Sequence, residues 1–196
     1  MDEMKSAREI AREKTEKLGE VTEEERLRWK YIPEGEKLAV KYLNRDCDLA
    51  VELSHYEEKA KKYIIKGAEA VLLIGIDLPK NDLAISKNKR AMDGLRSLKS
   101  DKAAIDKVYS EIRNFFNHYI EQGEQQRKQT YESLKAEFKA KLQQAVEQQL
   151  GSGVGVEIDV ESLPQFMEEW RKTLVQLDWQ YIRLLDEYKR ELKSIN

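Results

Sequence analysis

Cysteine and proline are scarce in this chain: Cys47 is the only cysteine, and three prolines occur among 196 residues. A single cysteine excludes an internal disulfide framework and suits a reducing compartment. The longest apolar run, residues 70–76, is far shorter than the ~20 residues that a transmembrane helix needs. Residues 1–17 are too densely charged for a secretory signal. We therefore expect a cytoplasmic protein with no membrane segment.

The chain also lacks an excess of charge of either sign. Its 35 basic and 37 acidic residues give a net charge of −2, so there is no bulk attraction to nucleic acid or to anionic membranes. Aromatic residues are few, at 8%, whereas charged residues make up 37%. A composition of this kind is typical of long helices and coiled coils with a thin core.

The stretch Asn81–Leu150 contains no proline, and its apolar residues recur in steps of three and four. That period places them on one face of a helix. The positions are Met92, Leu95, Leu98, Ile105, Tyr109, Ile112, Phe116, Tyr119, Tyr131, Leu134, Phe138, Leu142 and Ala145. Gly94, the pair at 100–101 and Gly123 are places where the helix could break, but we expect one continuous helix about 100 Å long.

Three further helices are expected before this stretch, the first of them over residues 4–18. Thr22 and Glu25 form a capping-box pattern that predicts a helix start, and Pro33 is expected to stop or kink that helix. From residue 34 to about residue 74 a stripe of small residues predicts a second long helix. The short connection at 77–82 makes it an antiparallel neighbour of the 81–150 helix.

After Leu150, residues 154–160 alternate between apolar and polar, which predicts an extended or β segment. The last helix carries a heptad-like seam with steps of four and three. Its members are Leu163, Met167, Trp170, Leu174, Leu177, Tyr181, Leu184, Tyr188 and Ile195. Trp179 and Ile182 lie off this seam, so the helix is expected to contact more than one neighbour.

Together these patterns predict an elongated all-α domain over residues 1–196, with coiled-coil-like pairing around one long central helix. We expect an N-terminal arm (1–32), a first helical hairpin (34–122) and a second hairpin (123–196). If the last connection folds back near residue 156, Ile195 should lie beside residue 117. Because two helices side by side bury little, we expect either a homodimer or compaction by a break near Ser100 or Gly123.

Two histidines raise the alternative of a metal-binding helical bundle. Glu52 and His55 have the Glu-x-x-His spacing of di-iron bundles, and His118 could contribute from a neighbouring helix. The pattern requires a second Glu-x-x-His, and the sequence has none, so we expect no metal and no cofactor. The glycine-rich residues 151–155 follow a helix rather than a strand, which is the wrong order for a phosphate loop.

Basic residues gather between Lys87 and Lys107, which raises a second alternative, a nucleic-acid-associated protein. The members are Lys87, Lys89, Arg90, Arg96, Lys99, Lys102 and Lys107. On a helix these residues spread over several faces, so an ordinary solvated surface is the simpler interpretation, and we do not expect nucleic acid as the partner.

Two segments resemble an uncharacterised family of small helical bacterial proteins. They are residues 4–14 (MKSAREIAREK) and residues 164–170 (PQFMEEW), the latter followed by Gln-Leu-Asp at 176–178 and by Tyr181. The resemblance spans most of the chain and carries no catalytic motif. It implies a bacterial, intracellular setting and no assigned activity.

The favoured interpretation is a non-enzymatic interaction or scaffold protein that associates with itself and with a protein partner of unknown identity. Its interface candidates are large apolar residues of the last helix, which are typical anchors of interfaces. They are Trp170, Leu174, Leu177, Trp179, Tyr181, Ile182, Leu184 and Tyr188.

Overall fold

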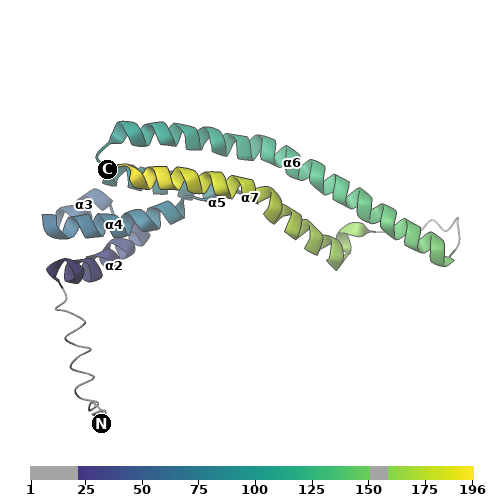
Figure 1. Ribbon diagram of the computed structural model, residues 1–196, viewed down its shortest axis with the longest axis horizontal. Coiled ribbons are helices and arrows are strands. Elements are labelled where there is room, and N and C mark those ends of the chain that lie inside the picture. The colour runs from purple at the N-terminus through teal and green to yellow at the C-terminus, as the bar shows by residue number, and fades with distance from the viewer. Residues whose placement is uncertain (1–21, 151–158) are drawn as a thin grey trace, which may run out of the picture. The chain divides into compact units, whose positions relative to one another are not determined.

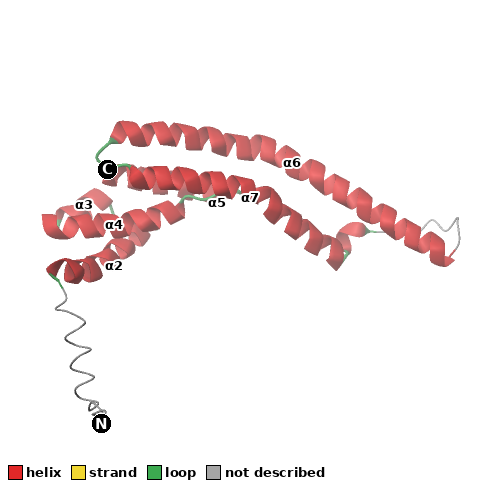
Figure 2. Ribbon diagram, viewed as in Figure 1, coloured by secondary structure: helices red, strands yellow, loops and turns green. Residues whose placement is uncertain are grey.

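The computed structural model describes residues 22–150 and 159–196, and every element in these ranges is helical (Figures 1 and 2). The elements are α2 (Glu23–Leu43), α3 (Leu49–Ser54), α4 (Glu58–Gly75), α5 (Asp82–Leu98), α6 (Lys102–Leu150), the 3₁₀ helix η1 (Val160–Ser162) and α7 (Pro164–Ser194). The all-α prediction with a long helix is thus confirmed. Across the described ranges, no helix combines the length and apolar character required to span a membrane.

Helix α2 begins where the capping-box pattern predicts. The Glu25 amide donates to Thr22 Oγ1 at 3.2 Å, and the Thr22 amide donates to a Glu25 carboxylate oxygen at 2.9 Å. The predicted stop at Pro33 is wrong, because α2 runs through this proline to Leu43. An internal proline removes one backbone hydrogen bond, at a cost of about 3 kcal/mol, and packing along the rest of α2 outweighs it.

The single helix predicted from residue 34 to 74 is also wrong, since the chain forms α2, α3 and α4 there. Arg45 adopts a left-handed backbone (φ 68°) just after α2, which ends that helix. Asp48 then caps α3 by accepting from the Ala50 amide at 2.8 Å. The break lies in the polar segment 44–48, where local side-chain hydrogen bonds compete with helix continuation.

The chain groups into two compact units, residues 1–75 with 93–98 and residues 76–92 with 99–196. In the first unit, α2 and α4 run in the same direction, since Glu23 pairs with Lys59 at their starts and Ile32 meets Gly67 further along. Gly35 and Gly67 are both buried at this contact. A Cβ on Gly35 would lie 2.0 Å from the Ile64 carbonyl oxygen, so only glycine allows the two backbones to approach this closely.

The predicted continuous helix over 81–150 is wrong at residues 99–101, where α5 ends and α6 begins. Asp101 caps α6 by accepting from the Ala104 amide at 2.9 Å. The amides of Ser100 and Asp101 both donate to the Asn196 carbonyl oxygen at 2.9 Å, and Lys99 Nζ donates to the Ile195 carbonyl. The backbone groups freed by the break therefore bond to the end of α7, whereas Gly123 leaves α6 unbroken.

In the second unit, α6 and α7 lie side by side and antiparallel (Figure 1). Ring contacts define the register: Phe138 meets Phe166, Tyr131 meets Trp170, and Phe115 meets Tyr188. Ile195 therefore lies beside residue 99, and the predicted position beside residue 117 is wrong. The reason is that α6 continues past the start of α7, so the chain does not fold back symmetrically about residue 156.

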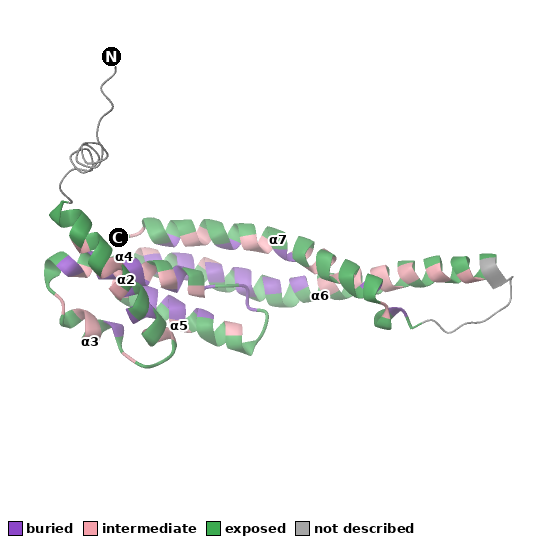
Figure 3. Cartoon of the chain, turned by 90° about the horizontal axis from the view of Figure 1, so that it is seen from below, coloured by how far each residue is buried: buried purple, intermediate pink, exposed green. Residues whose placement is uncertain are grey.

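The buried side of α7 is rotated slightly from the predicted seam. The residues buried on α7 are Phe166, Asp178, Leu185 and Leu192. Met167 and Leu184, both assigned to the seam, are exposed. Among the α6 residues whose burial is described, the last buried one is Gly123, and residues 124–148 are half-buried or exposed (Figure 3). The α6–α7 core is consequently concentrated between the start of α6 and Gly123.

Most of the predicted extended segment at 154–160 lies outside the described residues. Within the described part, Asp159 has an extended backbone and Val160 opens η1, so no strand is present there. The glycine-rich residues 151–155 and the first 21 residues likewise lie outside it. The division into an arm and two hairpins stays a prediction.

Candidate functional site

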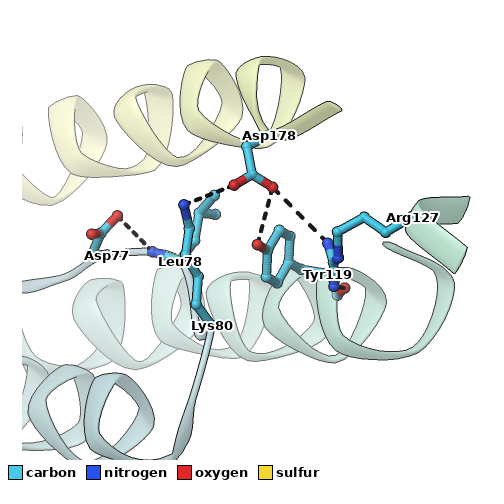
Figure 4. A network of polar contacts seen from close by, with 6 residues as sticks. All are labelled: Asp77, Leu78, Lys80, Tyr119, Arg127 and Asp178. Carbon is cyan, nitrogen blue, oxygen red and sulfur yellow. Dashed lines mark hydrogen bonds and ion pairs between the residues drawn. The ribbon is translucent and has the colours of Figure 1, made fainter. Parts of the chain in front are cut away.

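A buried carboxylate, Asp178, lies at the centre of the polar network in the second unit (Figure 4). Asp178 is only 8% exposed. Lys80 Nζ lies 2.7 Å from Asp178 Oδ2, and the Tyr119 hydroxyl donates to Asp178 Oδ1 at 3.0 Å. Arg127 Nη1 is 4.0 Å from the same Oδ1. Two cations and one hydroxyl thus satisfy the buried charge, as burial of a carboxylate requires.

Helix α6 positions Tyr119 and Arg127 two turns apart on one face, with Gly123 between them. The Arg127 guanidinium lies over the Tyr119 ring, 4.5 Å from its centroid, and also donates to the Tyr119 carbonyl at 3.4 Å. A Cβ on Gly123 would approach Arg127 Nη1 to 3.0 Å. Glycine therefore gives the arginine room to fold back along the helix toward Asp178.

Lys80 reaches the network from the connection between α4 and α5. Two hydrogen bonds fasten this connection to Asn88, which is buried: the Asp77 amide donates to Asn88 Oδ1 at 2.8 Å, and Asn88 Nδ2 donates to the Asp77 carbonyl at 2.6 Å. The Lys80 amide then donates to the Leu78 carbonyl at 2.8 Å, which closes a tight turn. The lysine is therefore presented by a fixed loop.

Burial, followed by the negative charge of Asp178, raises the pKa of Tyr119 to about 12. The tyrosine consequently remains protonated and acts as a hydrogen-bond donor. The network can therefore hold α6, α7 and the 76–81 connection together, because the Asp178 carboxylate bonds to Lys80 and Tyr119 and pairs at longer range with Arg127.

Tyr119→Phe tests this donor. At neutral pH the variant should be less stable to unfolding by about 2 kcal/mol, because one hydrogen bond to a charged acceptor is lost. In the wild type, the raised pKa means that the folded state keeps a proton that the unfolded state releases above about pH 10. The extra stability of the wild type should therefore shrink between pH 10 and 12. Urea unfolding of both proteins across this range measures the difference, and a constant difference would contradict the assignment.

A groove of about 520 Å³ opens beside the Asp178 network. Its apolar wall comes from Pro79, Ile120, Leu174 and Val175. Its charged residues are Lys80, Glu124, Arg127, Arg171 and Asp178, so basic groups outnumber acidic ones by three to two. We call it the Asp178 groove.

A second groove of about 520 Å³ lies between α6 and α7 on the other side of their seam. We call it the aromatic groove, because three of its lining residues are Phe115, Tyr181 and Tyr188. The Phe115 ring centroid is 5.8 Å from that of Tyr181 and 5.9 Å from that of Tyr188. The remaining lining residues are Glu111, Asn114, His118, Gln180 and Leu184.

The outward side of α7 carries large apolar residues that contribute little to the core. Val175 is 64% exposed and Trp179 is 58% exposed, whereas Ile182 is half-buried. Their spacing of four and three residues places them on one side of the helix. We call Val175, Trp179 and Ile182 the α7 outer stripe.

The three predicted metal candidates do not form a donor set. Glu52 lies in α3, and His55 is the exposed C-cap of that short helix. His118 lines the aromatic groove, where its Nδ1 is 3.4 Å from the Tyr181 hydroxyl. Within residues 22–150 and 159–196, no three His, Cys, Asp or Glu side chains come close enough to hold a metal ion.

The predicted interface residues divide into two sets. Trp170, Tyr181 and Tyr188 contact α6 of the same chain through ring pairs, and Leu174 and Leu177 are half-buried. Trp179 and Leu184 are exposed, and Ile182 is half-buried. Trp179 and Leu184 leave the most surface for a partner, and the use of any of these residues in an interface stays a prediction.

The predicted basic section is interrupted by the fold. Lys99 is 7% exposed, and its Nζ donates to backbone carbonyls of α7. It is therefore removed from the surface that a nucleic acid could reach. The nucleic-acid alternative loses one of its seven cations to a structural role.

Sequence reasoning missed the Asp178 network, although a signal was present. Asp178 follows Leu177 directly and precedes Tyr181, so a carboxylate stands within a regular apolar seam. A charged residue at such a position needs a buried partner. The partners Lys80 and Arg127 lie far away in the sequence, and no pattern identifies them.

The described residues form an all-α protein with two grooves along the α6–α7 pair. The chain belongs to a family of unknown function, DUF6657, whose model matches residues 50–194. The second resemblance segment, 164–170, falls within this match, and residues 4–14 precede it. Comparison with curated proteins and with solved structures finds no similar protein.

Proposed function

We propose that this protein is a non-enzymatic, self-associating interaction or scaffold component of the bacterial cytoplasm. The observation that carries the proposal is the exposure of Trp179 and Val175 on the α7 outer stripe. Tryptophan is enriched at the energetic centres of protein interfaces, and a row of exposed large apolar side chains marks a contact surface. A second copy of the chain is the occupant that best fits the surrounding charges.

Four charged residues flank the outer stripe in a symmetric order. Lys172 lies seven residues before Trp179 and Asp186 lies seven after it. Glu168 lies eleven residues before and Arg190 eleven after. All four are exposed, and at 3.6 residues per turn they point to the same side of α7 as Trp179.

This order suits an antiparallel pair of α7 helices with a two-fold axis at Trp179. Lys172 would then face Asp186 of the partner subunit, and Glu168 would face Arg190 of the partner subunit. A parallel pair would instead bring each charge against its own copy. Isologous contacts of this kind are the usual basis of homodimers, and matched charges set their orientation.

In the monomer, Lys172 bonds to Glu168 of its own helix at 3.0 Å. Both side chains are more than half exposed, so water screens their attraction and the pair contributes little to stability. It can therefore rearrange without much loss when a second helix arrives.

Trp179→Glu tests the proposal by sedimentation. The wild type should be dimeric at tens of micromolar, and the variant should be monomeric because a charge replaces the central anchor in both copies. Loss of a hot-spot residue raises a dissociation constant by roughly 30-fold or more. Trp29→Glu is the matched control, since Trp29 is 64% exposed on α2 and should leave the dimer intact. A variant at Trp179 that is as dimeric as the wild type would overturn the proposal.

A further inference from the structure

The aromatic groove has walls suited to a small ligand. Phe115 is the hub of the rings, tilted by 45° to Tyr181 and by 55° to Tyr188. The His118 ring stands 5.9 Å from that of Tyr181. These rings line a groove of about 520 Å³, which is within the usual size of small-molecule sites.

The charge that lines the aromatic groove is negative. Glu111 is its only acidic lining residue, and no lysine or arginine lines it. In contrast, three basic residues line the Asp178 groove. Burial raises the pKa of Tyr188, and the neighbouring carboxylates of Glu111, Glu191 and Glu187 raise it further. The raised pKa of the Tyr188 hydroxyl therefore indicates a negative electrostatic potential at this end of the groove.

Aromatic faces and carboxylates attract the same kind of ligand. The face of an aromatic ring is electron-rich and attracts cations within about 6 Å of its centroid. Alkylated ammonium and guanidinium groups are weakly hydrated, so they give up water more readily than a primary ammonium. A carboxylate at the edge of the rings adds direct charge attraction. Asn114 and Gln180 offer amide oxygens at the rim of the groove.

We propose that the aromatic groove binds a weakly hydrated organic cation, an alkylated ammonium or a guanidinium group, against the half-buried rings of Tyr181 and Tyr188, which pack on the buried Phe115, with Glu111 balancing its charge. The cation can be a free small molecule or the side chain of a peptide, and both present the same chemistry. The site is separate from the α7 outer stripe and does not depend on self-association.

The test is an NMR titration of the full chain, which follows the amide signals of residues 111–118 and 180–188. Choline is the free cation, and 3,3-dimethyl-1-butanol is its neutral isostere. A blocked Gly-Arg-Gly peptide supplies the side-chain form. At least one cation should bind saturably with a millimolar dissociation constant, and the isostere should bind at least about fivefold more weakly. The tighter of the two cations identifies the source.

Two variants locate the binding. Glu111→Gln should weaken cation binding by about threefold to tenfold and leave the isostere unaffected, because only charge is removed. Tyr188→Leu should abolish it. Glu132→Gln, an exposed change elsewhere on α6, is the control and should have no effect. Titrating the Trp179→Glu variant as well separates this site from the proposed dimer.

Two outcomes would overturn the inference. Equal binding of choline and its isostere would mean that the groove is only an apolar cleft. Absence of saturable shifts with any cation up to about 50 mM would mean that the rings and Glu111 do not form a site. Glu111→Gln keeps the test decisive if Tyr188→Leu fails to fold.

Discussion

Gly35→Ala and Gly67→Ala should each destabilise the first unit by about 3 kcal/mol. An alanine Cβ would lie 2.0 Å from the Ile64 carbonyl oxygen in the first variant and 2.1 Å from the Ile32 carbonyl oxygen in the second. Both obstacles are backbone atoms, so the helices must move apart and lose packing. A loss of stability is unusual for this substitution, because replacing glycine by alanine inside a helix ordinarily stabilises the helix by about 1 kcal/mol.

Urea unfolding followed by the helix signal measures this loss, and hydrogen exchange of α2 and α4 amides places it in the first unit. Gly123→Ala is the matched control, since Gly123 is also a buried helical glycine. There the nearest atoms are the ends of the Arg127 and Tyr181 side chains, at 3.0 and 3.3 Å, and these can give way. The control should change stability by less than about 1 kcal/mol. If Gly35→Ala and Gly67→Ala were as stable as the wild type, this result would contradict the close packing of α2 against α4.

Asp178→Ala should destabilise the second unit by about 2–3 kcal/mol. The change leaves the Tyr119 hydroxyl and the Arg127 guanidinium without their buried acceptor, while Lys80 can turn to water because it is half exposed. Asp178→Asn should cost only about 1 kcal/mol, since its amide oxygen can still accept from Tyr119.

Thermal and urea unfolding of both Asp178 variants measure these differences. Glu132→Ala, an exposed acidic residue of α6, controls for the loss of one negative charge and should lie within about 0.5 kcal/mol of the wild type. If Asp178→Ala proved as stable as the control, the network would not act as a clamp.

Helix class and helix caps could be predicted from the sequence because they depend on neighbouring residues. The Thr22 capping box and the antiparallel α6–α7 pair follow from local spacing and from heptad steps. The sequence marked the pair at 100–101 as a place where the helix over 81–150 could break, but it could not decide between a break and continuity. The break depends on Asn196 and Ile195, whose carbonyl groups bond to residues 99–101 from almost a hundred residues away.

Pro33 and Gly67 illustrate a similar limit in the first unit. Local propensity argues for a helix end at a proline and against a glycine inside a helix. Tertiary packing reverses both arguments, because α2 gains a long contact with α4 and glycine is needed for the closest approach. The same limit applies to the candidate sites. Sequence spacing identified Trp179 and Ile182, but the partners of Asp178 come from separate segments.

The central claim, antiparallel self-association through α7, is tested most directly by mixing two charge variants. Lys172→Glu with Arg190→Glu makes every facing pair acidic, and Glu168→Lys with Asp186→Lys makes every facing pair basic. Sedimentation should show each variant as a monomer alone and a heterodimer when the two are mixed, because mixing restores four opposite-charge pairs. Circular dichroism checks that both variants keep their helices. A mixture that stays monomeric while the wild type is dimeric, or variants that remain dimeric alone, would contradict this account.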